Sequence, residues 1–147
     1  MKSSFSSQPS VLLVDDNRDG LIVRRALLEE QGFHVEIAAN GQEGLKLFER
    51  VHFDVVVTDY RMPVMTGLEL IRSIRLQTPD ARVVLLSGLV EPLGLTEANT
   101  GADAVVAKNS REATHLIRSV KRVMNRPPAR KPAGSQTASR TLARVRA

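Results

Sequence analysis

Short apolar runs alternate along this chain with longer segments of helical periodicity. The runs cover residues 11–14, 34–39, 55–57, 83–86 and 104–107. Four of them are almost wholly apolar and rich in Val, which is typical of parallel strands buried on both faces of a sheet. The second run alternates, with His34 and Glu36 set between apolar residues, and this pattern suits an edge strand.

The segments between the runs carry apolar residues at helical spacing. They predict helices over residues 17–31, 40–51, 66–77 and 111–125. The first can be capped by Asp16 or Asn17, and Ser110 can cap the last. Between the fourth and fifth runs, Pro92 and Gly94 interrupt the pattern, so we expect a short or irregular helix there.

The alternation of strand and helix predicts the fold class. It indicates an α/β domain with a doubly wound, five-stranded parallel sheet and helices on both faces. A length of 147 residues favours one such domain, which we assign to residues 10–125. In open sheets of this kind, functional groups gather at the carboxyl ends of the strands.

Composition narrows the function classes. The chain has no Cys, which excludes disulfides, thiolate metal sites and cysteine nucleophiles. No apolar stretch approaches the roughly 18 residues that a membrane span needs. The N-terminus also lacks the apolar core of a secretory signal. We therefore expect a cytoplasmic protein with no membrane partner.

The net charge of +5 belongs to the C-terminal end. Six of the 21 basic residues and no acidic residue lie beyond residue 125, so the rest of the chain holds 15 basic and 16 acidic residues. The segment 126–147 is basic and rich in Pro, Ser and Thr, and we expect it to be a disordered tail. We also expect residues 1–9 to be disordered.

Polar residues stand where four of the five predicted strands finish. Asp15 and Asp16 follow the first run, Asp59 the third, Ser87 the fourth and Lys108 the fifth. In a doubly wound sheet these positions converge on one edge. Two carboxylates at about 4 Å repel by ~4 kcal/mol at an effective dielectric of ~20, so three of them require positive charge nearby. Lys108 supplies one charge, and hard oxygen ligands suit Mg²⁺ for the rest.

Each residue also has an ordinary structural interpretation. Asp16 could simply cap the first helix, Ser87 could form a serine turn, and Lys108 could extend along the surface. Taken singly, the last two interpretations are the better ones. The functional interpretation gains weight because all of these residues fall at matching strand ends.

The motifs together resemble the receiver domains of response regulators. They are Asp15-Asp16, Asp-x-x-Met-Pro-x-Met-x-Gly from Asp59 to Gly67, Ser87-Gly88, Gly101-Ala102-Asp103 and Lys108. The resemblance covers residues 10–124. It implies a CheY-like, flavodoxin-like (βα)5 fold with strand order 2-1-3-4-5.

The same resemblance implies a function in a two-component phosphorelay. Asp59 would accept a phosphoryl group from a sensor histidine kinase or a phosphotransfer protein, and the altered conformation would modulate an output partner. Mg²⁺ would be bound by Asp16, Asp59 and the backbone carbonyl of Arg61, with Asp15 acting through water.

Two further roles follow from the resemblance, together with departures from the family pattern. Lys108 would pair with the phosphoryl oxygens, and the Ser87 hydroxyl would move inward to bond one of them. The position three before Lys108, often aromatic in the family, is Val105, and the usual Pro after Lys108 is Asn109. The segment from Ser87 to Lys108 is about one residue shorter than the family pattern. The phosphorylation chemistry should survive these changes, but we assign no aromatic switch.

Two alternatives stay open from the sequence. One is a receiver-fold scaffold whose basic tail binds nucleic acid or another anionic partner. The absence of aromatic interleaving and of a helix-turn-helix disfavours nucleic acid. The other is an enzyme on the same architecture, but the chain has no glycine-rich phosphate loop, and its acid pair is adjacent rather than Asp-x-Asp. We therefore expect catalysis only of the protein's own phosphorylation and dephosphorylation. The sequence identifies no particular output partner, and it is compatible with a homodimer.

Overall fold

The computed structural model describes residues 8–125. The predicted disorder of residues 1–7 and of the basic tail, 126–147, lies outside the described residues. Of the predicted N-terminal segment, Gln8 and Pro9 are described, and His34 N donates a hydrogen bond to Pro9 O (2.9 Å). None of the helices within residues 8–125 combines the length and the hydropathy that crossing a membrane requires.

The elements alternate as the periodicity predicts. The strands are β2 (Ser10–Val14), β3 (His34–Ala38), β4 (Val55–Asp59), β5 (Val83–Ser87) and β6 (Ala104–Ala107). The helices are α1 (Arg18–Glu30), α2 (Gly41–Arg50), α3 (Gly67–Gln77), α4 (Val90–Leu93), α5 (Glu97–Thr100) and α6 (Glu112–Asn125). The interrupted segment thus forms two short helices, and Gly94 ends the first of them in the left-handed conformation (φ 60°).

One parallel sheet of five strands has the order β3-β2-β4-β5-β6. In chain order this is 2-1-3-4-5, so the expected fold class and topology are confirmed, with the alternating second run on an edge. The order reverses at β2, which pairs with β3 on one side and β4 on the other. A crevice at the carboxyl ends is expected at such a reversal.

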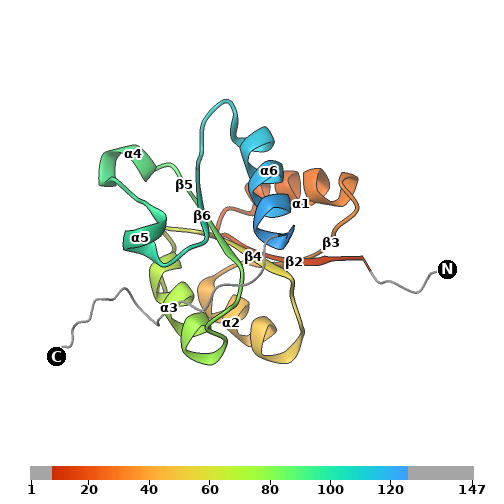
Figure 1. Cartoon of the computed structure of the whole chain (residues 1–147), viewed down its shortest axis with the longest axis horizontal. Coiled ribbons are helices and arrows are strands. Elements are labelled where there is room, and N and C mark those ends of the chain that lie inside the picture. Colours follow the sequence, from red (N-terminus) through yellow and green to blue (C-terminus); the bar gives the residue numbers. More distant parts are fainter. Residues whose placement is uncertain (1–7, 126–147) are drawn as a thin grey trace.

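Residues on each strand alternate between two apolar layers. Val11 and Leu13 of β2 belong to a cluster with residues of α1 and α6, whereas Leu12 and Val14 belong to a cluster with residues of α3. Figure 1 shows α1 and α6 on one side of the sheet and α2 and α3 on the other. Burial on both faces explains why the strands read as continuous apolar runs.

Side chains at the helix starts fix where the loops end. Asn17 caps α1, because its Oδ1 accepts a hydrogen bond from Gly20 N (3.0 Å). Thr66 and Glu69 form a capping box at the start of α3. The bond at the start of α6 comes from Asn109, whose Oδ1 accepts from Arg111 N (2.8 Å), rather than from Ser110 as expected. Asn109 precedes the helix by one more residue, and its short amide reaches back to the turn.

A buried ion pair stabilises the sheet at the amino ends of its strands. Arg75 of α3 is 1% exposed and donates to the carbonyl oxygens of Gly101, Pro79 and Ala81. Its Nη2 also lies 2.9 Å from Asp103 Oδ2, which in turn accepts from Val83 N (2.8 Å). This guanidinium therefore ties α3 to the segments that enter β5 and β6.

Candidate functional site

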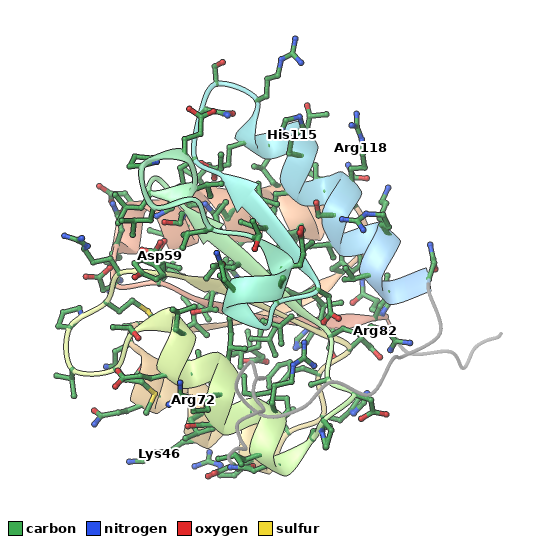
Figure 2. The ribbon with its side chains drawn as sticks, turned by 60° about the vertical axis from the view of Figure 1, so that its left-hand side comes forward. Lys46, Asp59, Arg72, Arg82, His115 and Arg118 are labelled. Carbon is green, nitrogen blue, oxygen red and sulfur yellow. The ribbon has the colours of Figure 1, made fainter. Side chains whose placement is uncertain are left out.

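The predicted site residues meet at the carboxyl ends of the central strands. Asp15 and Asp16 follow β2, and Lys108 follows β6. Asp59 is the last residue of β4, and Ser87 is the last residue of β5. In Figure 2, Asp59 lies well apart from Arg82, which precedes β5 at the other end of the sheet.

Three carboxylates form a cluster that could hold a metal ion. Asp15, Asp16 and Asp59 each offer an oxygen, and these oxygens lie within 4.8 Å of one another. Within residues 8–125, the exposed Asp16 carboxylate makes no hydrogen bond or ion pair, and the α1 cap is Asn17. Asp16 is therefore available as a ligand. A donor set made of carboxylate oxygens fits a hard divalent cation.

Asp59 is buried and already faces a cation. Its carboxyl Oδ1 accepts a hydrogen bond from Tyr60 N (2.8 Å) and lies 3.2 Å from Lys108 Nζ. Burial raises the pKa of Asp59 above its ordinary value, and the negative charge of Asp15 raises it further, while Lys108 opposes both effects. A carboxylate in this position gains from any additional positive charge placed beside it.

Lys108 bridges two of the acids. Its Nζ lies 3.2 Å from Asp59 Oδ1 and 3.5 Å from Asp15 Oδ2. The backbone of Lys108 is fixed beside β5, because Lys108 N donates a hydrogen bond to Ser87 O (3.0 Å). The side chain of Lys108 therefore does not extend along the surface into solvent, as its ordinary structural interpretation had it.

Ser87 is buried at the same edge, and its hydroxyl is engaged. The residue is 1% exposed, and Oγ accepts a hydrogen bond from Leu89 N (2.9 Å). This is the serine turn that its local sequence favours. A hydroxyl has one donor as well as two acceptor sites, so Ser87 can still donate to a group placed in the site.

The loop after Asp59 is held by a close backbone approach. A Cβ on Gly67 would lie 2.1 Å from Asp59 O, and Gly67 N donates to Tyr60 O (2.7 Å). Within this loop Val64 is 83% exposed and has a positive φ of 71°, which is strained for a β-branched residue. Arg61 lies in the same loop with an exposed side chain, and its carbonyl stays a predicted metal ligand.

The sequence analysis missed a buried cation beside Asp15. Arg24 of α1 is 8% exposed; its Nη1 lies 2.8 Å from Asp15 Oδ2 and its Nε 2.6 Å from Glu112 Oε2. The spacing of Leu21, Arg24 and Leu28 on one helix face could have indicated its burial. Ile22, an apolar residue of the same helix, is 54% exposed.

Known proteins of one family are similar to this chain. The family model of the response regulator receiver domain matches residues 11–121. A response regulator receiver protein of Anaeromyxobacter sp. (strain Fw109-5) is 40% identical over 98 residues, which are 66% of this chain and 41% of that protein. The chain thus spans less than half the length of this curated relative.

Solved structures of the same fold are also similar. The chemotaxis protein CheY4 of Vibrio cholerae is 30% identical with a TM-score of 0.72, and the match covers 79% of this chain and 98% of that one. The response regulator TrrA of Thermotoga maritima, solved in complex with Mg²⁺ and BeF, is 30% identical with a TM-score of 0.71. That match covers 78% of this chain and 98% of TrrA.

Proposed function

This chain belongs to the family of response regulator receiver domains, and from that membership we propose that Asp59 is the residue that accepts the phosphoryl group. The observation that carries the proposal is the pairing of a buried Asp59 with Lys108 beside two more carboxylates. The donor would be a phosphohistidine on a sensor kinase or a phosphotransfer protein, and the product would modulate an output partner.

The charges around Asp59 suit phosphoryl transfer. The loose transition state of this reaction spreads negative charge over the transferred oxygens, so catalysis depends on positioning and neutralisation. Lys108 Nζ, 3.2 Å from Asp59, is placed to pair with those oxygens. We propose that Asp16, Asp59 and the carbonyl of Arg61 would hold Mg²⁺ directly, and Asp15 through water. Bound there, the ion would supply further positive charge to the same oxygens.

In the proposed step, an Asp59 carboxylate oxygen attacks phosphorus. A phosphorus–oxygen bond forms while the phosphorus–nitrogen bond of the donor breaks, and its electron pair leaves with the imidazole, which takes a proton from solvent. Hydrolysis of the acyl phosphate by water returns the carboxylate and releases phosphate. The domain thus acts on its own phosphorylation state.

Phosphorylation would change the contacts of Ser87. The new group carries about −1.5 to −2 charges and three acceptor oxygens. A Ser87 hydroxyl that swings inward to donate to a phosphoryl oxygen would draw Oγ away from Leu89 N, from which it accepts a hydrogen bond at 2.9 Å. The segment from Gly88 to Val90 would then shift, which couples the site to α4.

Labelling with a small phosphodonor tests the assignment of Asp59. The wild-type domain should incorporate phosphate from acetyl phosphate in the presence of Mg²⁺, and chelation of the metal should stop the reaction. Asp59→Asn should abolish labelling. Asp80→Asn removes an exposed carboxylate from another loop and should label as the wild type does. Labelling that persists in Asp59→Asn would place the acceptor elsewhere.

The scaffold with a nucleic-acid-binding tail is not favoured as an alternative. The family match spans residues 11–121, whereas the basic residues that motivate a nucleic-acid partner lie beyond them and outside the described part of the chain.

A further inference from the structure

Arg24 makes two short ion pairs that join the acidic site to another helix. Its Nη1 lies 2.8 Å from Asp15 Oδ2, and its Nε lies 2.6 Å from Glu112 Oε2 in the first turn of α6. The three side chains are 10%, 2% and 20% exposed, so water screens these pairs weakly. A guanidinium is planar with five donors and can serve two carboxylates at once.

The local sequence makes room for this side chain. A Cβ on Gly20, one turn earlier in α1, would lie 2.5 Å from Arg24 Nη1. Gly is a poor helix former, costing about 1 kcal/mol against Ala, so its presence inside α1 needs another reason. Space for the guanidinium supplies that reason.

Asp15 is consequently held at both oxygens. Oδ1 accepts a hydrogen bond from Asn17 N (3.0 Å), and Oδ2 contacts both Arg24 Nη1 (2.8 Å) and Lys108 Nζ (3.5 Å). Lys108 in turn contacts Asp59. Alternating charges therefore run without a break from Glu112 through Arg24, Asp15 and Lys108 to Asp59.

We propose that Arg24 is a positioning residue of the phosphorylation site, which orients Asp15 for the metal and links the site to the first turn of α6 through Glu112. The inference rests on the proposed function of the acidic cluster. It adds a residue outside that cluster and a route to α6 that bypasses Ser87. Partners that orient metal ligands typically change metal affinity by about 10- to 100-fold when removed.

Variants that change the charges of Arg24 and Glu112 distinguish a positioning role of Arg24 from a purely electrostatic effect on Mg²⁺ binding. Arg24→Met alone removes the cation that Asp15 and Glu112 share and leaves Asp15 with Lys108 only, so an electrostatic role predicts tighter Mg²⁺ binding. The double variant Arg24→Met/Glu112→Gln removes one charge of each sign, so an electrostatic role predicts nearly unchanged binding. A positioning role predicts that the double variant binds Mg²⁺ about 10-fold or more weakly.

Mg²⁺ titration of the protein is the direct measurement. Tyr60 is the only Tyr, the chain has no Trp, and Tyr60 N contacts Asp59, so intrinsic fluorescence reports on the site. The matched control is Arg25→Met/Glu29→Gln, which removes an exposed pair from α1 and should bind Mg²⁺ as the wild type does. Arg24→Lys keeps the charge with a single ammonium and should fail to restore binding.

A second measurement follows the link to α6. In the wild type, Mg²⁺ should shift the backbone amide resonances of residues 111–115, and in Glu112→Gln it should not. Glu112 lies at the outer end of the ion pairs that run from Asp15 through Arg24, so Glu112→Gln stays informative even if Arg24→Met fails to fold. Thermal denaturation would show whether Arg24→Met folds. Wild-type affinity in the double variant or in Arg24→Lys, or retained shifts in Glu112→Gln, would overturn the inference. Labelling of the wild type, and its loss in Asp59→Asn, shows separately whether the proposed function stands.

Discussion

Replacing Gly67 by Ala would press α3 against the end of the strand that carries Asp59. The added Cβ would lie 2.1 Å from Asp59 O and 3.0 Å from both Asp59 C and Tyr60 Cα. All three are backbone atoms, so no side chain can rotate away to relieve the contact. The helix start and the strand end must instead separate by about 1.3 Å before the Cβ reaches 3.4 Å from Asp59 O, where ordinary van der Waals contact begins.

The separation should affect both stability and chemistry. Overpacking typically costs about 1–3 kcal/mol, and contact with rigid backbone puts this site at the upper end, near ~3 kcal/mol. For a domain of this size, that corresponds to a fall in Tm of about 10 °C. A misplacement of about 1 Å at a reacting group costs about 100-fold in rate, so phosphorylation of Asp59 should slow by about that factor.

Urea unfolding and the rate of labelling by acetyl phosphate measure the two effects separately. Gly88→Ala is the matched control, because a Cβ there meets nothing within 4 Å although Gly88 also borders the site. It should change stability by less than about 0.5 kcal/mol. A Gly67→Ala domain with wild-type stability and labelling rate would refute the reasoning that this glycine sets the distance between α3 and Asp59.

Two further substitutions test other parts of the structure. Arg75→Met removes the cation from a buried pair with Asp103 and should lower the unfolding free energy by about 3–5 kcal/mol. The control Arg72→Met, at an exposed position of the same helix, should lower it by less than about 0.5 kcal/mol. Equal urea midpoints for the two variants would contradict the role of the buried pair. The raised pKa of Asp59 means that the native state holds this proton more tightly than the unfolded state, so its contribution to stability falls as pH rises above the unfolded value near 3.8. Asp59→Asn should therefore be more stable than the wild type at pH 7, and the difference should disappear in acid below that value. A constant difference across this pH range would show that the carboxyl does not titrate as the burial requires.

The elements that follow simple periodicity could be predicted from the sequence. The strands are buried on both faces, so their apolar runs are continuous, and the observed bounds differ from the predicted ones by at most two residues. The meeting of the candidate site residues could be predicted because a parallel sheet brings the carboxyl ends of its strands together. The order of the strands came from the resemblance to receiver domains rather than from any pattern in the residues.

The missed features all depend on contacts between distant segments. Arg24 and Arg75 are charged residues at helix positions that face the core. Apolar neighbours mark the buried face around Arg24, but a charge at such a position argues against burial unless its partner is known. Their burial depends on partners 88 and 28 residues away, namely Glu112 and Asp103. Gly67 belongs to the motif seen in the sequence, but the reason a glycine is needed there, the close approach of α3 to the end of β4, does not follow from the sequence of the loop alone.

Val105 limits how the proposed movement of Ser87 would spread through this chain. Val105 is partly buried, pairs with Leu85 across the sheet and packs against the apolar cluster on the α3 face. A β-branched side chain has little rotational freedom at χ1 and no ring that could move between solvent and core. A shift of Ser87 therefore has no aromatic group on β6 to displace. The bridge from Asp15 through Arg24 to Glu112 reaches α6 on the opposite face of the sheet, so α6 can respond to the site without any movement of Val105.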